Sequence, residues 1–514
     1  MIGEVTEDQS ESLGFLEIPA SYGLTEPVIR IDTHASHVFL AGDCVYKMKR
    51  ALRYPYLDYG TIERRRWACE RELALNRRTA PALYLGLAAL RRGRGGRLHL
   101  DRDGRGEGEA VEWMVVMRRF GADALLDHRA SHGLLPPDLM RRAAAAIATF
   151  HRGADICPDG AGSAAMSAVI EENFEELRAQ PELFDAGVVA EIEARSRQAF
   201  AGVAPLLDRR RAEGMVRQCH GDLHLRNICV VDGEPMLFDC IEFNDDFARI
   251  DVLYDLAFLL MDLVHRDHVD LANVAANEYV KDGLRLDGLG LLSFFMATRA
   301  TIRAKVEGSA AALAGRISGS ALAETKAYLD LAHRLLAPTV PLLVAVGGLP
   351  GTGKTTLARA IAPALGGVVG AFHWRSDVVR KQMAEVDELT RLPPETYTRE
   401  ASDRVYAEML RRARETLAAG HVAILDATFT APNERRAAEV LAAEAGAAFA
   451  GFWLEAPDEE LRRRLVARKG DASDATPAVL ETMREFRMGE IAWHRINSAG
   501  PDPARRILEL LDRG

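Results

Sequence analysis

The 514-residue sequence has only six cysteines, no CxxC pair and no cysteine after Cys240. This scarcity argues against a disulfide framework and a cysteine-based zinc site, and it is typical of a protein whose thiols stay reduced. The sequence also lacks an excess of basic residues, because its formal net charge is -10 at pH 7. Affinity for a phosphate backbone comes mainly from clustered Lys and Arg, so the charge argues against a dedicated nucleic-acid binder.

Long hydrophobic runs are missing as well. The most apolar helical stretch, "VLYDLAFLLMDLV", is too short to span a bilayer and is interrupted by Asp255 and Asp262. The first twenty residues are acidic and lack the basic start and apolar block of a secretory signal. We therefore expect a cytoplasmic protein with no membrane segment; nothing in the sequence indicates an oligomeric state.

The chain is too long for one ordinary core, and its composition is that of a globular protein with about half of its residues apolar. In "APTVP", Pro338 and Pro341 end a helical stretch, because proline removes a backbone donor and disfavours helix just before it. We expect an N-terminal segment at 1–27, a first domain at 28–337 with a small lobe at 28–120 and a helical large lobe at 121–337, and a second domain at 338–514.

Short alternating apolar segments between residues 27 and 118 predict an antiparallel sheet, interrupted by one helix in "GTIERRRWACERELALNRRTA". The Arg- and Gly-rich piece "DRDGRG" is interpreted as a hairpin turn between two strands rather than a nucleic-acid tail. After residue 341, strand-like runs alternate with long helical runs, which predicts a parallel sheet covered by helices.

The run "GLPGTGKTT" follows an apolar strand and opens a helix, the setting that a phosphate-binding loop requires. Its glycines allow backbone N–H groups to converge on phosphate oxygens at a helix N-terminus. Lys354 is expected to reach the β- and γ-phosphates, and Thr355 to bind Mg²⁺. The predicted nucleotide-binding residues of this loop are Gly348, Leu349, Pro350, Gly351, Thr352, Gly353, Lys354, Thr355 and Thr356.

Other polar residues of the second half complete a catalytic set. Asp377 and Arg380 in "SDVVR" share a helix face, where Asp377 could act as general base and Arg380 could bind the acceptor. Asp426 ends an apolar strand, where a carboxylate would assist Mg²⁺. Arg464 and Arg468, four residues apart on one helix face, could stabilise the transferring phosphoryl group. Two alternatives stay open: "SDVVR" could be only a capped helix, and the arginines only a solvated face.

With these motifs, the second half resembles the P-loop kinases related to gluconate kinase, zeta toxins and the polynucleotide kinase fold. The resemblance covers about residues 340–512 and rests on the phosphate loop, "SDVVR" and the arginine-bearing segment. It leaves the phosphoryl acceptor undefined.

The run "HGDLHLRN" of the first half holds a second constellation. Asp222 precedes Asn227 by five residues, the spacing with which protein-kinase catalytic loops place a base and a metal ligand. Asp239 follows at the end of an apolar strand, as a second metal ligand would. Upstream, Lys47 and Lys49 lie on one face of a predicted strand, and Glu72 in the next helix could pair with either lysine. We prefer Lys47 as the lysine that contacts the phosphates.

Neighbouring polar residues have competing interpretations. His220 and His224 could bind a metal, but no third ligand of suitable spacing appears, so they are expected to support the loop. Asp251 and Asp255 are interpreted as a helix-start acid and a buried hydrogen-bonding acid. A pair of arginines, Arg299 and Arg303, could line an anionic acceptor pocket or an exposed helix face.

These residues resemble the aminoglycoside phosphotransferase family, also called choline/aminoglycoside kinase-like enzymes, over about residues 28–310. The family's glycine-rich nucleotide loop has no clear counterpart, only "HASHVFLAGD". The two resemblances together match a known bacterial fusion. They imply a two-lobed α+β protein-kinase-like domain followed by an α/β P-loop NTPase domain with a parallel sheet.

The implied activity is a bifunctional phosphotransferase that uses ATP and Mg²⁺, each domain moving a γ-phosphoryl group to the hydroxyl of a small molecule. Two alternatives differ in the second domain. It could be a nucleotide-sensing module that regulates the first domain, or a toxin-like or nucleic-acid 5′-hydroxyl kinase. The fold does not fix the acceptor of either site.

Overall fold

The computed structural model describes residues 4–54, 56–282, 286–313 and 318–512, with their side chains except those of residues 282 and 313. The first three residues of the expected N-terminal segment lie outside these ranges. The chain packs into two compact units. The first unit comprises residues 1–266, 282–284 and 295–333, and the second comprises residues 267–281, 285–294 and 334–514.

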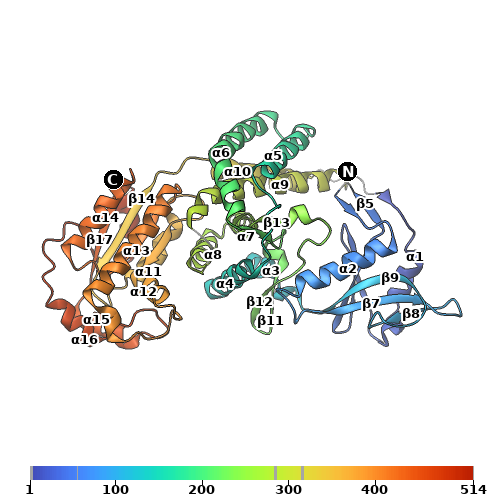
Figure 1. Ribbon diagram of the computed structural model, residues 1–514, viewed down its shortest axis with the longest axis horizontal. Helices are drawn as coiled ribbons and strands as arrows, with labels where there is room; N and C mark the ends of the chain where they lie inside the picture. Colours follow the sequence, from blue (N-terminus) through green and yellow to red (C-terminus); the bar gives the residue numbers. More distant parts are fainter. Residues whose placement is uncertain (1–3, 55, 283–285, 314–317, 513–514) are drawn as a thin grey trace. The chain divides into compact units, whose positions relative to one another are not determined.

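A six-stranded antiparallel sheet forms the small lobe of the first unit, in the order β2-β3-β4-β9-β7-β8. Helix α2 (Ile62–Asn76) lies across this sheet (Figure 1). Alternation along β4 sends Tyr46 and Met48 into the apolar core on one face, which leaves Lys47 and Lys49 on the other. The strands are β2 (Ile29–Asp32), β3 (Ser36–Ala41), β4 (Cys44–Lys49), β7 (Tyr84–Arg92), β8 (Leu98–Asp101) and β9 (Glu109–Arg118).

The pairing of β8 corrects one prediction. Strand β8 pairs with β7 and not with β9, so "DRDGRG" connects two strands that are not partners. The hairpin turn lies instead at residues 93–97, where Gly96 has a φ of 76°. The glycines of "GRGG" form this turn. The sequence could not show this, because "GRGG" and "DRDGRG" both contain turn-forming glycines and either could close a hairpin.

The large lobe of the first unit is mainly helical, as predicted. Two short antiparallel strand pairs carry the candidate site: β10 (Val216–Gln218) pairs with β13 (Arg249–Asp251), and β11 (Ile228–Val231) forms a hairpin with β12 (Glu234–Leu237). The predicted "VDGE" turn joins β11 to β12, with Asp232 and Gly233 at positive φ. The helices are α3 (Leu126–Ser131), α4 (Pro137–Gly153), α5 (Ser163–Arg178), α6 (Ala186–Ala212), α7 (Val252–His265), α9 (Leu292–Leu313) and α10 (Gly319–Leu335).

A five-stranded parallel sheet, in the order β15-β16-β14-β17-β18, forms the centre of the second unit. The predicted α/β architecture is therefore confirmed, and helices flank the sheet (Figure 1). Its strands are β14 (Leu342–Gly348), β15 (Phe372–Arg375), β16 (Ala423–Asp426), β17 (Ala448–Glu455) and β18 (His494–Asn497). Its main helices are α11 (Lys354–Ile361), α12 (Ser376–Met383), α13 (Arg399–Ala418), α14 (Pro432–Glu444), α15 (Asp458–Ala467), α16 (Pro477–Arg484) and α17 (Pro503–Leu511).

Helix α8 (Val269–Asp282) precedes the expected boundary at residue 338, yet most of it belongs to the second unit. Side chains of α8 hydrogen-bond the backbone at and just before β15, the edge strand. In the described part of the chain, no helix is both long and apolar enough to cross a membrane.

Candidate active sites

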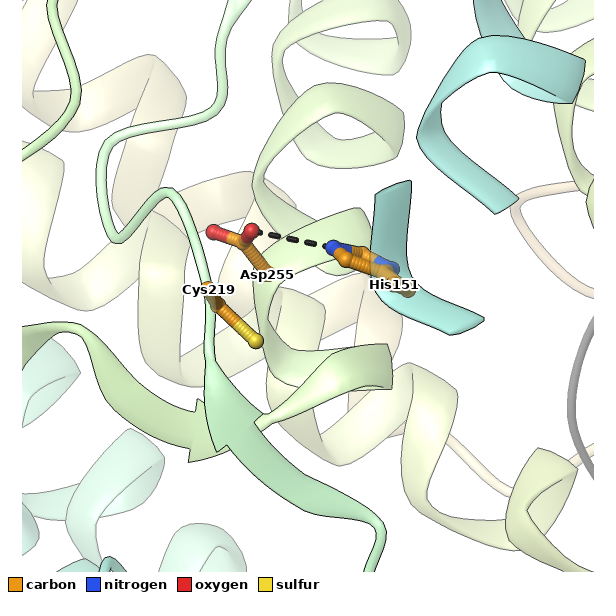
Figure 2. A group of neighbouring side chains, drawn as sticks. All are labelled: His151, Cys219 and Asp255. Atoms are coloured by element: carbon orange, nitrogen blue, oxygen red, sulfur yellow. Dashed lines mark hydrogen bonds and ion pairs between the residues drawn. The ribbon is translucent and has the colours of Figure 1, made fainter. Parts of the chain in front are cut away.

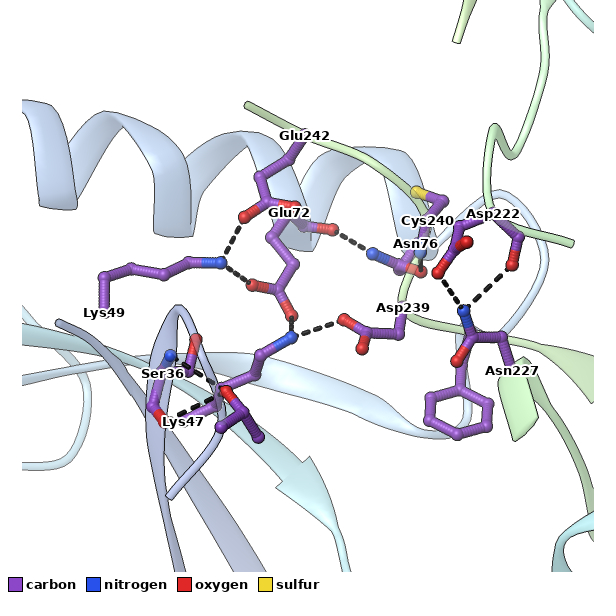
Figure 3. Close-up of polar contacts among 12 residues, drawn as sticks. Ser36, Lys47, Lys49, Glu72, Asn76, Asp222, Asn227, Asp239, Cys240 and Glu242 are labelled. Atoms are coloured by element: carbon purple, nitrogen blue, oxygen red, sulfur yellow. Dashed lines mark hydrogen bonds and ion pairs between the residues drawn. The ribbon is translucent and has the colours of Figure 1, made fainter. Parts of the chain in front are cut away.

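A network of buried ion pairs links β4 to helix α2 in the first unit (Figure 3). Lys47 Nζ lies 2.9 Å from Glu72 Oε1 and also contacts Asp239, while Lys49 Nζ lies 2.5 Å from Glu72 Oε2 and also contacts Glu242. Burial disfavours the Lys47 ammonium, but Asp239 and Glu72 outweigh it and hold the pKa of Lys47 well above its usual value. Both lysines are therefore cationic, and Lys47 is the one that reaches the predicted metal ligand.

The catalytic loop is held by acids of helix α7. Asp255 accepts hydrogen bonds from the backbone N–H groups of His220 and Gly221, both at 2.9 Å, and Asp262 accepts one from Leu225 at 3.0 Å. Asp251 caps α7 and accepts from Leu253 at 2.8 Å. Asp251 is thus the expected helix-start acid, and Asp255 is the expected buried hydrogen-bonding acid.

Within this loop, Asn227 Nδ2 donates to Asp222 Oδ2 at 2.9 Å, which fixes the carboxylate (Figure 3). His224 Nε2 lies 3.3 Å from the same Oδ2, and His220 Nε2 lies 2.9 Å from the carbonyl of Phe238. Burial opposes ionisation of Asp222, but His224 and Arg299 outweigh it, so the pKa of Asp222 is lowered. The histidines are loop supports, and Asp222 is ionised at neutral pH.

Asp239 stands just after β12 in a left-handed conformation, with a φ of 62°. A non-glycine residue in this region costs about 1–3 kcal/mol and persists only where its surroundings hold it. Here the Tyr84 hydroxyl accepts from Asp239 N at 3.1 Å, and Lys47 holds the carboxylate. With the amide of Asn227, the carboxylate of Asp239 is the oxygen donor set that Mg²⁺ prefers.

His151, Cys219 and Asp255 form a buried cluster whose ligand atoms lie within 4.8 Å of one another (Figure 2). His151 Nε2 lies 3.1 Å from Asp255 Oδ2. Burial and the carboxylates of Asp255 and Asp251 raise the pKa of the Cys219 thiol well above its usual value. A metal needs the thiolate, and both Asp255 oxygens already accept backbone N–H groups, so the cluster is a hydrogen-bonded brace of the catalytic loop.

The phosphate-binding loop of the second unit turns between β14 and α11. Gly351 and Gly353 have φ values of 85° and 82°, and a Cβ at Gly351 would lie 2.7 Å from the carbonyl oxygen of Leu461. Only glycine fits there. Lys354 Nζ folds over the loop and donates to the carbonyls of Gly348 at 2.9 Å and Leu349 at 3.1 Å. The other predicted loop residues, Pro350, Thr352, Thr355 and Thr356, lie in the same turn or in the first turn of α11.

Asp426 ends β16 directly beside this loop. Its Oδ2 accepts from Thr355 Oγ1 at 2.7 Å and lies 3.1 Å from His373 Nε2. Burial opposes the charge, but His373, Arg375 and Lys354 outweigh it and lower the pKa of Asp426. The structure thus brings the predicted Mg²⁺ residues Thr355 and Asp426 into contact.

Asp377 and Arg380 lie on α12, three residues apart as expected, but they face different partners. Arg375 Nη2 lies 3.6 Å from Asp377 Oδ2 and 2.6 Å from Asp471 Oδ1. Arg380 donates to the carbonyl of Thr396 at 2.6 Å and lies over the Tyr397 ring at 4.7 Å. Asp377 therefore lies beside Arg375, which is also 3.9 Å from Asp426 next to the phosphate loop, whereas Arg380 holds the segment before α13.

Of the two predicted arginines, only Arg464 lies within α15. Its Nη1 lies 3.4 Å from the Thr352 carbonyl of the phosphate loop, and its Nε lies 2.6 Å from Glu460 Oε1. Arg468 follows the helix in extended conformation and contacts the Ala475 carbonyl, so the expectation of one shared helix face is wrong. The helix ends at Ala467, because "RKGD" follows and glycine disfavours helix.

Arg375 and Asp471 complete the second site without having been assigned a role from the sequence, and Lys49 was left open there as the alternative to Lys47. Arg375 joins Asp377 to Asp471, and Lys49 fixes Glu72 from behind. Arg375 stands two residues before Asp377 at the end of an apolar strand, a signal that was available. The ion pair with Asp471 spans nearly a hundred residues and left no local pattern.

Comparison with known families finds a different family in each half of the chain. Residues 66–289 match the model of the phosphotransferase enzyme family, and residues 343–488 match that of the AAA domain. Uncharacterized proteins of Mycobacterium bovis and Mycobacterium tuberculosis are 34% identical over 485 residues, which is 93% of this chain and 93% of each relative. The chain belongs to their two-domain family.

Members of this family join a kinase domain of the phosphotransferase enzyme family to a P-loop domain, and this chain is a kinase. Among solved structures, a choline/ethanolamine kinase family protein from Mesorhizobium loti covers 64% of this chain and 94% of its own, with 17% identity and a TM-score of 0.40. A gluconokinase from Sinorhizobium meliloti covers 34% of this chain and 93% of its own, with 20% identity and a TM-score of 0.25.

Proposed function

We propose that the chain is a bifunctional phosphotransferase in which each unit moves the γ-phosphoryl group of ATP to a small-molecule hydroxyl. In the first unit, Asp222 orients the acceptor hydroxyl and receives its proton as the new P–O bond forms. Lys47, aimed by Glu72, neutralises phosphate charge. Asn227 and Asp239 would hold Mg²⁺, which supplies charge compensation to the phosphates when bound.

In the second unit, the glycine-rich turn and Lys354 bind the phosphates, and Thr355 with Asp426 would hold Mg²⁺. Asp377 receives the proton of the second acceptor, and Arg375 lies beside that carboxylate at 3.6 Å. Arg464 sits at the phosphate loop, where its charge stabilises the transferring group, and Arg468 shapes the segment beyond it.

The observation that carries the proposal is that each unit holds, within its own fold, all the charged groups that phosphoryl transfer requires. Each has a cation for the phosphates, a carboxylate for the hydroxyl proton and a carboxylate for the metal. Neither unit needs the other to supply a missing group.

The test uses the full chain with labelled ATP and a metabolite extract. Asp222→Asn should remove one set of labelled products, Lys354→Ala a different set, and the double variant both. Each loss should be roughly a hundredfold or more, as for removal of a positioned base or of a phosphate-binding cation. Asp232→Asn, in the exposed β11–β12 turn, is the matched control.

Two results would redirect the proposal. If Lys354→Ala removes no product but changes the rate of the first site, the second unit is a nucleotide-sensing regulator. If its labelled product is a 5′-phosphorylated RNA or DNA, the second unit is a nucleic-acid kinase.

A further inference from the structure

A cavity of about 460 Å³ opens beside the catalytic loop of the first unit, within the range of about 300–1,000 Å³ typical of small-molecule sites. Two loop residues, His224 and Arg226, line it, and His224 Nε2 lies 3.3 Å from Asp222 Oδ2. The cavity therefore adjoins the side chain that contacts the candidate base. The other lining residues are Phe258, Asp262, His265, Arg266, Arg303, Glu307, Glu324 and Tyr328.

Each carboxylate of this cavity already faces a basic group. Asp262 lies 2.8 Å from Arg266, Glu324 lies 2.8 Å from His265, and Glu307 contacts Arg303. A cationic acceptor would have to displace these partners, and leaving one of the charges unpaired in a partly buried site is costly. The walls instead present hydrogen-bond donors and acceptors side by side.

The aromatic rings are likewise engaged. Tyr328 stacks on His265 with ring centres 3.7 Å apart and planes at 8°, while Arg299 lies over Phe258 at 4.8 Å and His224 meets the same ring edge-on. An ammonium group is bound by aromatic faces that are open to it. Here guanidinium and imidazole groups cover those faces, so the cavity offers no aromatic cage.

Hydroxyl groups fit walls of this kind because each can donate to a carboxylate and accept from a guanidinium at once. We infer that the first site takes a neutral polyhydroxylated acceptor, of the sugar or sugar-alcohol class, and rejects amines such as choline or aminoglycosides. This inference rests on the proposed function of the first unit and names its substrate class. Arg303 and Glu324, from α9 and α10, are the specificity residues.

Binding is measured first, by calorimetry on the full chain with a non-hydrolysable ATP analogue and Mg²⁺. The probes are a set of hexoses, hexitols and inositol on one side, and choline and kanamycin on the other. We expect at least one neutral probe to bind and neither amine to do so. Arg303→Gln and Glu324→Gln should each weaken that binding about tenfold or more, since each removes a hydrogen bond to a charged group. Arg195→Gln, at a partly exposed position of α6, should leave it unchanged.

Binding of an amine, or of no neutral probe, would overturn the inference. An unchanged affinity in both cavity variants would do the same. Transfer of label to the bound neutral probe then tests the proposed function separately. If a neutral probe binds through Arg303 but is never phosphorylated in the presence of ATP, the substrate-class inference for the cavity stands and the phosphotransferase assignment of the first unit fails.

Discussion

At the scale of single residues, the two lysines of β4 have different roles around the same carboxylate, Glu72. Glu72 bridges them, with one oxygen on Lys47 and the other on Lys49, and Glu242 holds Lys49 from the far side together with Tyr59. Glu72 is fully buried and cannot turn away while both lysines are present. The geometry makes Lys49 a positioning residue that keeps Lys47 aimed at the phosphates.

The pair Lys49–Glu242 can be tested by removing one member or both. Lys49→Met leaves buried carboxylates uncompensated and should lower the free energy of unfolding by about 3–5 kcal/mol. The double variant Lys49→Met, Glu242→Met replaces one buried charge pair by apolar side chains and should regain much of that loss. The KM for ATP should stay raised in both variants, because Glu72 is released in both.

Denaturant unfolding and the dependence of rate on ATP concentration provide the two readouts. Recovery of both stability and KM in the double variant would show that Lys49 serves the fold alone. Arg53→Met, on an exposed strand of the same lobe, is the control for a cation removed from the surface.

The sequence predicted residues whose spacing carries their chemistry. The Asp222–Asn227 contact and the Thr355–Asp426 contact follow from a catalytic-loop motif and from a strand end beside a phosphate loop. It left Lys47 and Lys49 unresolved, because alternation places both on one face and only the partners Asp239 and Glu242 distinguish them. The sequence wrongly placed Arg468 within a helix, because a sequence pattern does not fix the last turn of a helix to the residue.

At the scale of elements, helix α8 protects the edge of the parallel sheet. Asn273 Nδ2 donates to the carbonyls of Val369 and Ala371, at 2.8 and 3.0 Å. Asn277 accepts from His373 N at 2.7 Å. An edge strand exposes unpaired backbone groups, and these two amides satisfy part of that edge. Since His373 also contacts Asp426, α8 fixes the strand that carries a residue of the second site.

Asn277→Ala should therefore destabilise the second unit. It leaves the partly buried His373 N–H without its acceptor, which should cost about 1 kcal/mol, the low end of the range for a buried donor. Calorimetric unfolding of the full chain checks this, with the exposed helical change Asn433→Ala as the control. Equal unfolding temperatures for the two variants would contradict a bracing role.

A fragment that starts at residue 338 lacks α8 and should unfold at lower urea concentration than the same unit in the full chain.

The packing of α8 could not be predicted from the sequence. An amphipathic pattern shows that a helix buries one face, but it does not show against which element. The same limit applied to β8. Alternation predicted this strand, but its partner could not be predicted without knowing which of two turns closes the hairpin. The elements around the phosphate loop were predictable, because the motif requires a strand before it and a helix after it.

At the scale of the whole molecule, each unit buries a neutral histidine that couples its folding to pH. His220 is fully buried in the first unit, and in the second unit His421, which is 5% exposed, donates from Nε2 to the carbonyl oxygen of Leu289 at 2.9 Å. Burial lowers the pKa of both histidines below 6.5. Since a carbonyl only accepts, the His421 Nε2 must carry the proton in this contact.

The sign of the pH effect follows from these lowered pKa values. Below pH about 6.5 the unfolded chain binds a proton at each histidine that the folded chain does not bind, so acidification favours unfolding. Between pH 6.5 and its pKa in the folded chain, each histidine should lower the free energy of unfolding by up to about 1.4 kcal/mol per pH unit. Scanning calorimetry from pH 8 to pH 5 should show both units losing stability once the pH falls below about 6.5.

His421→Gln keeps an amide donor for Leu289 and removes the titrating group. The unfolding transition of the second unit should then lose much of its pH dependence over this interval, while that of the first unit keeps its own. His268→Gln offers a histidine change outside both contacts for comparison. If the second transition of His421→Gln shifts with pH as steeply as that of the unchanged chain, other groups set the acid sensitivity of that unit. The Asp426 carboxylate cannot be that group, because its lowered pKa preserves stability until the pH falls below about 3.8.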